Sequence, residues 1–361
     1  MSGAGSGQPD AGALAAAIEA GLAGAGIPAL SAGTQRLMTA YRCGGALTAP
    51  VLATRADAAA YAAYRMPATA AAVALALAET RLSLPGWRPE SLLDFGAGTG
   101  SAAWAVAAEL PSVGVLTLLE QSTAAIAAGR AILGAAALPA LRAATWRTWR
   151  LPGGRPDPGR RDDLPAADLA TVSYVLGELT PTQQAAIVAL AIRAAPAVVL
   201  VEPGTPDGHH RILAARERLL AAGYLLAAPC PHRLACPLAA AGDWCHFAAR
   251  LPRSAVHRRA KGAELGYEDE KFSYVAAVRP DPLGPEPASP VLPAGRIVRR
   301  PQQRKGLVTL EVCWRDGTAG PDRIGKSTGA AYRAARKSFW GARFDHPPLA
   351  GTGADGQDEE P

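Results

Sequence analysis

The run LLDFGAGTGS, residues 92–101, limits the possible folds of this chain more than any other feature. Asp94 lies near the end of a short apolar segment, and three glycines follow at alternate positions before an alanine-rich helical segment. Glycine lets a backbone approach a ligand closely, and the start of a helix presents N–H groups that have no partner within the helix. The run therefore predicts a strand, a tight turn and a helix that together hold a nucleotide. A glycine-rich turn without any ligand is the alternative.

A second acidic residue supports the nucleotide interpretation. The segment VLTLLE places Glu120 at the tip of the next predicted strand, where a carboxylate can accept both hydroxyls of a ribose. A dinucleotide fingerprint, G-x-G-x-x-G, would need glycine at position 101, where the chain has Ser101. The phrase DFGAGTG instead resembles motif I of the class I methyltransferases that use S-adenosylmethionine. This resemblance implies the cofactor-binding residues Asp94, Gly96, Gly98, Gly100 and Glu120.

Short apolar segments alternate with helical stretches between positions 91 and 201. The apolar segments are LLDF, VLTLLE, ADLATVSYV and AVVLVE. Strands that alternate with helices predict a parallel, doubly wound sheet. We therefore expect an α/β fold: a Rossmann-like class I methyltransferase domain with a helical N-terminal region and a small C-terminal module that contains strands.

Changes of composition predict the boundaries of these parts. A chain of 361 residues is long enough for two domains, and proline-rich and glycine-rich stretches separate its segments. The predicted parts are a disordered start (1–10), a helical region (11–80), the S-adenosylmethionine-binding core (81–228), a cysteine-rich segment that returns to the sheet (229–279), a proline-rich linker (280–293), a basic module (294–346) and a disordered tail (347–361).

The composition indicates a globular protein, because 49% of the residues are hydrophobic and 19% are charged. The first ten residues have neither the basic residues nor the apolar core of a signal peptide. The longest apolar stretch, 68–78, has eleven residues, well short of the roughly 18 that a membrane span needs. We expect a cytoplasmic, monomeric protein without a membrane partner.

Positive charge is concentrated in one segment. Residues 250–343 contain 19 Lys or Arg against 9 Asp or Glu, a balance of +10 in a chain whose net charge is +6. Such a segment suits a polyanion such as RNA, and a solvated basic surface explains it equally well.

The cysteines also cluster. Five cysteines in a reducing compartment are expected to stay thiols. Three lie within sixteen residues and a fourth follows after 67 intervening residues: Cys230, Cys236, Cys245 and Cys313. This grouping indicates a metal site, and the spacing leaves zinc and an iron–sulfur cluster both open. His232 and His246 are additional ligands or groups that orient the ligands. Cys43 is expected to be an inert core thiol.

Several phrases together resemble one family. They are YAAYRMPAT, LLDFGAGTG, SYVLGEL, VEPGTPDG, APCPH, DWCHF and YEDEKFSYVA. In this order they closely resemble the methyltransferase-like family of small ribosomal subunit proteins, which occurs in mitochondria and in bacteria. The resemblance extends from about residue 40 to Trp340. DWCHF and YEDEKFSY are its most specific parts.

This resemblance implies the cofactors and partners. It implies S-adenosylmethionine and a 4Fe-4S cluster held by Cys230, Cys236, Cys245 and Cys313, with zinc as the alternative metal. The implied partners are the small ribosomal subunit and its rRNA, and the implied role is in ribosome assembly or translation. Members of the family commonly end the region with Trp-Gly-Asp, whereas this chain has Ala342 in the last position.

The sequence does not identify a catalytic residue. An amino methyltransferase carries Asn or Asp followed by Pro-Pro-aromatic after the fourth strand, where this chain reads SYVLGEL. Tyr174 and Glu178 are the evident polar groups there. Two hypotheses follow: an S-adenosylmethionine-dependent rRNA methyltransferase, or an assembly factor that keeps the fold and the metal cluster without catalysis.

A second glycine-rich pattern is rejected as a phosphate-binding loop. GPDRIGKS, residues 320–327, matches the P-loop spacing. A P-loop begins directly at the end of a buried strand, and here Arg315–Ala319 intervene. We expect Lys326 to belong to the basic surface.

Overall fold

The structure is a computed structural model, and it describes residues 11–23, 30, 32–36, 52–151, 164–252, 267–280 and 289–345. The described residues divide into two compact units. The first contains the described residues up to 230 and from 242 to 292, and the second contains 231–241 and 293–345. Each unit is described by itself. The predictions for 1–10, the end of the chain, most of the proline-rich linker and Cys43 lie outside the described residues.

The first unit is built on one mixed sheet with the strand order β3-β2-β1-β4-β5-β8-β6. Five strands run parallel: β1 (Ser91–Phe95), β2 (Val115–Glu120), β3 (Thr145–Thr148), β4 (Leu169–Ser173) and β5 (Ala197–Pro203). The long strand β8 (Tyr267–Val278) runs antiparallel between β5 and β6 (Leu225–Ala228) and also pairs with β7 (Phe247–Pro252). This arrangement is the Rossmann-like class I methyltransferase fold, so the predicted fold class is confirmed.

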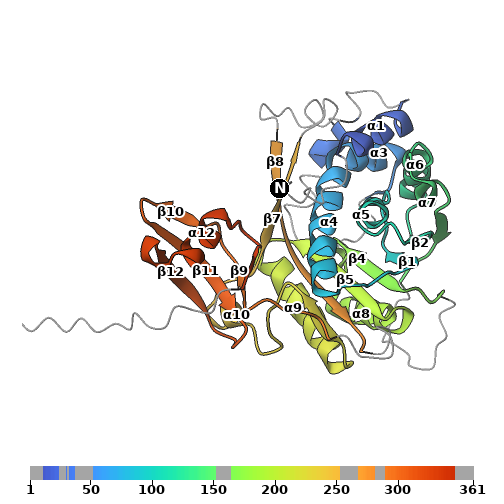
Figure 1. The fold of residues 1–361 in the computed structure, drawn as a ribbon. Coiled ribbons are helices and arrows are strands. Elements are labelled where there is room, and N and C mark those ends of the chain that lie inside the picture. The colour runs from blue at the N-terminus through green and yellow to red at the C-terminus, as the bar shows by residue number, and fades with distance from the viewer. Residues whose placement is uncertain are drawn as a thin grey trace, which may run out of the picture. The chain divides into compact units, whose positions relative to one another are not determined.

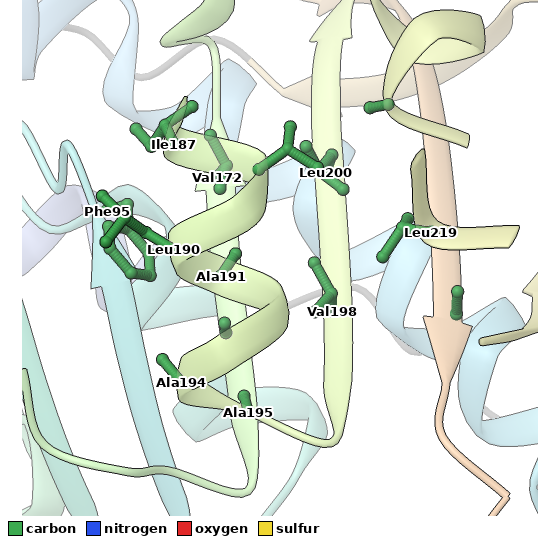
Figure 2. Close-up of a cluster of buried hydrophobic side chains, with 14 of the residues drawn as sticks. Phe95, Val172, Ile187, Leu190, Ala191, Ala194, Ala195, Val198, Leu200 and Leu219 are labelled. Atoms are coloured by element: carbon green, nitrogen blue, oxygen red, sulfur yellow. The ribbon is translucent and has the colours of Figure 1, made fainter. Parts of the chain in front are cut away.

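Helices cover both faces of this sheet, as a doubly wound fold requires. On one side α4 (Met66–Ser83) packs on the β5–β8 half, and α5 (Ser101–Glu109) packs beside it on β1. On the other side lie α8 (Pro181–Ala194) and α9 (Pro206–Ala221) (Figure 1). Figure 2 shows Leu190 and Ala191 of α8 against Val172 and Val198 of the sheet. This core fixes the carboxyl ends of the parallel strands, where ligands of such sheets bind.

The N-terminal helices pack on the same unit. They are α1 (Ala11–Gly21) and α3 (Arg55–Tyr64), and α3 leads directly into α4. The Thr54 side chain accepts a hydrogen bond from the N–H of Asp57, whose carboxylate accepts from the N–H of Thr54. This capping box fixes where α3 begins. The unit also contains α6 (Thr123–Gly134), α7 (Pro139–Arg142) and the 3-10 turn η1 (Leu176–Glu178).

The second unit contains a small five-stranded antiparallel sheet and the helices α10 (Pro237–Ala240) and α12 (Ala330–Lys337). Its strand order is β10-β11-β9-β13, and β12 pairs with the other edge of β11. The strands are β9 (Gly295–Ile297), β10 (Gln302–Arg304), β11 (Leu307–Trp314), β12 (Ala319–Gly325) and β13 (Arg343–Phe344). The 3-10 turn η3 (Lys326–Thr328) and α12 (Ala330–Lys337) follow β12. Ala342 is buried in the core of this unit.

The structure confirms the rejection of a phosphate-binding loop. Residues 320–325 of GPDRIGKS are not a loop but lie in β12 and pair with β11 from Leu307 to Val312. A strand engaged on one edge along its length does not form the N–H cradle of a P-loop. Among the residues that the structure describes, no helix is both long and apolar enough to cross a membrane.

Candidate cofactor site

The glycine-rich turn joins β1 to α5 at the carboxyl edge of the sheet. Gly96, Gly98 and Gly100 have φ angles of 70°, 56° and 93°, a region that L side chains rarely adopt. A Cβ on Gly96 would lie 2.5 Å from Cγ2 of Val175, and a Cβ on Gly100 would lie 3.0 Å from Cδ1 of Leu133. Both glycines are therefore required by backbone conformation and by close packing.

Gly98 is the open position of the turn. A Cβ there would meet only the Tyr61 ring, at 3.8 Å. The N–H of Gly98 donates to Glu120 Oε2 at 2.8 Å, and the N–H of Ser122 donates to Glu120 Oε1 at 2.7 Å. A carboxylate offers about four lone-pair sites, so two acceptor sites of Glu120 remain for a ribose hydroxyl pair. The turn thus combines an accessible backbone with an oriented carboxylate.

Asp94 is buried beneath the turn and is only half satisfied. Its Oδ1 accepts a hydrogen bond from Thr171 Oγ1 at 2.7 Å, while Oδ2 has no partner in the described part of the chain. Burial raises the pKa of Asp94 to about 7, the Thr171 hydrogen bond lowers it, and the charge of Glu120 raises it further. A buried carboxylate oxygen without a partner favours a ligand that carries an N–H donor or a positive charge.

A third carboxyl group adds to the negative potential at this edge. Burial, followed by the charges of Glu120 and Glu202, raises the pKa of Glu178 to about 7. Glu120 thus raises the pKa of both Glu178 and Asp94, which places three carboxyl groups within electrostatic reach of one another. A bound cation relieves such repulsion. S-adenosylmethionine carries a sulfonium and an ammonium, so its charge fits this site.

Buried hydroxyl groups at the same edge also lack partners in the described residues. They belong to Thr99 and Ser101 in the turn and to Ser173 at the end of β4. Buried polar groups are rarely left without a hydrogen bond, and exceptions mark strain, function or an absent partner. Together with Asp94 Oδ2, these groups are the orphaned polar atoms expected where a ligand completes a site.

The chain after β4 is held in an unusual conformation. Tyr174 has a φ of 60°, the left-handed region that non-glycine residues rarely occupy. The buried Glu202 carboxylate accepts from the N–H of Leu176 at 2.9 Å and from Arg211 Nε at 2.8 Å. Glu202 therefore fixes the turn η1 that carries Glu178. Strained backbone of this kind occurs at functional sites and persists when its surroundings determine it.

The Tyr174 side chain is engaged by an ion pair. Arg65, at the junction of α3 and α4, donates from both Nη atoms to the Glu270 carboxylate, at 3.0 and 2.9 Å. The Tyr174 hydroxyl donates to Glu270 Oε1 at 2.9 Å, and the guanidinium carbon lies 5.5 Å from the Tyr174 ring centroid. The network joins α3, β8 and the turn after β4. The hydrogen of the Tyr174 hydroxyl is thus already donated to Glu270.

The structure therefore brings the predicted cofactor residues to one edge of the sheet: Asp94, Gly96, Gly98, Gly100 and Glu120. Glu178 lies at the same edge. Their role in binding stays a prediction.

The four cysteines of the predicted cluster are divided between the units. Cys230 and Cys245 belong to the first unit, and Cys236 and Cys313 belong to the second. Among the described residues, no group of three or more His, Cys, Asp or Glu side chains gathers as a metal-binding group. The four-cysteine cluster therefore stays a prediction.

The two histidines near the cysteines have distinct surroundings. His232 Nε2 lies 3.4 Å from Cys313 Sγ within the second unit. His246, in the first unit, stacks on the Trp244 ring with centroids 5.3 Å apart, and Trp244 Nε1 donates to the carbonyl of Gly204 at 3.0 Å. His232 thus contacts a predicted ligand, whereas His246 packs on an aromatic ring.

Comparison with protein families matches residues 55–345 to the family described as mitochondrial small ribosomal subunit Rsm22. The chain belongs to the Rsm22 family. It is also 28% identical over 311 residues to the human mitochondrial ribosome assembly protein METTL17. That match covers 78% of this chain and 61% of METTL17, so the chain spans about three-fifths of its relative's length.

Solved methyltransferase structures are also similar to this Rsm22-family chain. Precorrin-6y C5,15-methyltransferase from Geobacter metallireducens is 19% identical, with a TM-score of 0.36, 57% of this chain and 86% of that chain covered. Magnesium protoporphyrin IX methyltransferase from Synechocystis, solved with bound S-adenosylmethionine, is 14% identical, with a TM-score of 0.34 and coverages of 59% and 79%. These scores are low, and the fold assignment rests on the strand order.

Sequence reasoning did not identify the Arg65–Glu270 pair or the hydrogen bond from Thr171 to Asp94. The signal was present, because Arg65 lies in YAAYRMPAT and Glu270 in YEDEKFSYVA, two phrases that carry the family resemblance. Nothing in a single sequence pairs residues that are 205 positions apart.

Proposed function

We propose that this Rsm22-family protein binds S-adenosylmethionine at the turn between β1 and α5 and acts on the small ribosomal subunit during its assembly. The main support is the combination of the open Gly98 backbone, the oriented Glu120 carboxylate and the Asp94 oxygen that has no partner among the described residues. The ribosomal part is supported by the family and by the name of METTL17, a ribosome assembly protein.

The ribose and the positively charged groups of the cofactor have chemically suitable partners. Glu120 suits the ribose hydroxyls, and the turn residues suit the groups that lie over the backbone. The carboxyl groups of Asp94 and Glu178 suit the positive charges of the methionine part. When bound, S-adenosylmethionine supplies an electrophilic methyl group, and the protein has chiefly to align a nucleophile with it.

Substitution of Glu120 tests the cofactor assignment. Glu120→Ala is expected to weaken binding of S-adenosylmethionine by about 1–3 kcal/mol, because two ribose hydroxyls lose their acceptor. Isothermal calorimetry on the purified protein measures this. Glu90→Ala, an exposed glutamate at the opposite end of the sheet, is the control and should bind as the parent does. Equal affinity in the Glu120 variant and the parent, or binding by neither, contradicts the assignment.

A non-catalytic assembly factor is the second candidate function. The hydrogen bond from the Tyr174 hydroxyl to Glu270 favours it. An amino methyltransferase presents its target-binding motif after the fourth strand, and here the Tyr174 hydroxyl at that place already has a partner. Mapping of methylated rRNA nucleotides in a strain that lacks the gene separates the two functions. A methylation restored by the parent and not by Glu120→Ala supports the enzyme, and an unchanged methylation pattern supports the assembly factor.

The 4Fe-4S cluster is a further part of the proposal. Its support is the family resemblance and a donor set of four thiols, the ligand type that such clusters use. The ligands are Cys230, Cys236, Cys245 and Cys313, and His232 beside Cys313 would contribute a hydrogen bond to one of them.

Protein purified without oxygen is therefore expected to be brown, and serine at any of the four ligand positions should remove the colour and the iron. Cys43→Ser is the control and should change neither. Colourless protein with stoichiometric zinc contradicts the iron assignment while keeping the ligands. Iron retained after Cys313→Ser excludes that residue from the ligand set.

A further inference from the structure

One end of the second unit is strongly basic. Residues 289–345 contain 12 Lys or Arg against 4 Asp or Glu. Six exposed cations gather on α12, on η3 and at the turn of the β10–β11 hairpin. These six form what we term the α12 face: Arg304, Lys305, Lys326, Arg333, Arg336 and Lys337.

The packing of α12 directs three of these side chains outward. Ala335 is buried in the core of the unit, and Ala331 packs against the same core. Residues three and four positions apart share a face of a helix, so Arg333 and Lys337 lie opposite the buried alanines, with Arg336 beside them.

Two hydrogen bonds bring the hairpin to the same place. The Gln303 side chain donates to the carbonyl of Arg336 at 3.0 Å, which joins β10 to the last turn of α12. The N–H of Lys326 donates to the carbonyl of Gly306 at 2.8 Å, which joins the hairpin turn to η3. Arg304 and Lys305 at that turn are thus neighbours of Lys326.

The acidic residues of this unit do not neutralise the α12 face. In the described part of the chain, none of the six basic side chains makes an ion pair. Asp316 lies beyond the far end of β11, about 25–30 Å from the hairpin turn at 3.4 Å per residue, and its carboxylate accepts from Thr318. Asp345 accepts from the N–H of Ala294. The other two acidic residues, Glu311 and Asp322, lie on the paired strands β11 and β12, and neither makes an ion pair with the six cations in the described part of the chain.

An exposed aromatic ring lies next to these cations. Phe339 is 64% exposed and follows α12 by two residues. A single exposed apolar side chain is common on protein surfaces and needs no explanation by itself. An aromatic ring close to several cations is, however, the combination that proteins use to bind single-stranded nucleic acid. The cations attract phosphates, and the ring offers a surface on which a base can stack.

We infer that the α12 face is the RNA-binding surface of this protein, with its cations on the phosphates and an unpaired base stacked on Phe339. The inference deepens the proposed function and rests on it, because it names where the rRNA binds. It commits to RNA with unpaired nucleotides, since a base buried in a duplex cannot reach a protruding ring.

Removal of charge from α12 tests the phosphate contacts. In the full chain, Arg333→Gln/Arg336→Gln/Lys337→Gln should lower the slope of log K against log salt by about 2–3, at 0.7–0.9 per lost phosphate contact, for an rRNA hairpin with an unpaired loop. The matched control is Arg88→Gln/Arg130→Gln/Arg218→Gln, three exposed arginines of the first unit. The control should keep the slope of the parent. Equal slopes in the two triple variants overturn the inference.

Substitution of the ring tests the stacking contact. Phe339→Ala should weaken binding to the looped hairpin by about 10-fold or more, whereas Phe339→Tyr should bind as the parent does. A fully paired duplex of equal length should bind Phe339→Ala and the parent alike. Equal losses on both RNAs, or no loss on either, overturn the stacking contact.

Two further measurements separate this inference from the proposed function. S-adenosylmethionine binding should be unchanged in all these variants. If the parent protein binds no RNA at all, the ribosomal part of the proposed function fails together with the inference. If the parent binds RNA and the α12 variants bind equally well, the inference alone fails. Stronger binding to vesicles of anionic phospholipid than to RNA, lost in the α12 triple variant, replaces RNA by a membrane surface.

Discussion

Glu270→Ala is expected to lower the free energy of unfolding by about 2–4 kcal/mol, because it leaves the Arg65 guanidinium without its carboxylate in a mostly buried place. The Arg65 and Glu270 side chains are 17% and 10% exposed, and Glu270 also accepts from the Tyr174 hydroxyl. Burial lowers the pKa of Arg65, but the Glu270 carboxylate raises it more, so the net pKa lies above the ordinary value and the arginine stays charged. Urea denaturation followed by circular dichroism measures the loss.

The neighbouring residue provides the control. Asp269 also accepts two hydrogen bonds from an arginine, Arg250, at 2.7 and 2.8 Å. That pair is 55% and 37% exposed, and exposed ion pairs contribute about 0–1 kcal/mol. Asp269→Ala should therefore change the stability little. Equal losses in the two variants would mean that the Arg65–Glu270 pair is solvated and does not hold the turn after β4.

A second readout connects this pair to the site. Without Glu270, Tyr174 loses the hydrogen bond that supports its left-handed backbone, so the turn that carries Glu178 should loosen. Amide hydrogen exchange of residues 174–178 should accelerate in Glu270→Ala and stay unchanged in Asp269→Ala. The same acceleration in both variants would contradict this coupling.

The strands that the sequence predicts well are those with continuous burial. β1, β2, β4 and β5 coincide with the predicted apolar segments to within two residues at every end, because strands buried on both faces need an uninterrupted apolar run. β3 escapes such reasoning, since only Trp146 of its four residues is buried. The antiparallel direction of β8 is equally invisible, because an apolar run has no direction in the sheet.

The parts of the candidate site that are close in sequence can be predicted for the same local reason. Its contacts between residues far apart in the sequence cannot. The glycine turn and Glu120 follow from spacing within thirty residues, and the structure places them together. The hydrogen bond from Thr171 to Asp94 and the ion pair of Arg65 with Glu270 join residues 77 and 205 positions apart. Such contacts depend on the strand order, which a single sequence does not encode as a local pattern. The grouping of 231–241 with the C-terminal strands is a third example.

Asp94→Asn is expected to stabilise the protein at pH 8 and to weaken its binding of S-adenosylmethionine. Burial raises the pKa of Asp94 from 3.8 to about 7, so the folded state binds a proton that the unfolded state releases. Stability therefore falls as the pH rises from about 4 to 7, and above 7 the buried charge costs on the order of 2–4 kcal/mol. Asparagine keeps an acceptor for Thr171 and carries no charge, which removes much of this cost.

The pH profile of the variant decides this prediction. Thermal unfolding should show Asp94→Asn above the parent at pH 8, and the difference should shrink as the pH falls below 7 and vanish below about 4, where the carboxyl is protonated in the unfolded state as well. Thr171→Val removes the hydrogen bond that lowers the pKa of Asp94, so it should move the midpoint of the parent profile to higher pH. A variant that is less stable than the parent at pH 8 contradicts the assigned burial cost.

Cofactor binding should follow the opposite trend, because a cationic ligand binds the ionised carboxylate. The affinity of the parent for S-adenosylmethionine should rise between pH 6 and pH 8 as Asp94 and Glu178 lose their protons, and binding at pH 6.5 should release protons to the buffer. Asp94→Asn should bind about 10-fold more weakly at pH 8, because it loses the charge whose burial the ligand offsets. The pH dependence that remains in this variant belongs to Glu178, and Asp94→Asn/Glu178→Gln should abolish it. Affinity that stays constant from pH 6 to 8 in the parent would exclude both carboxyl groups from the cofactor site.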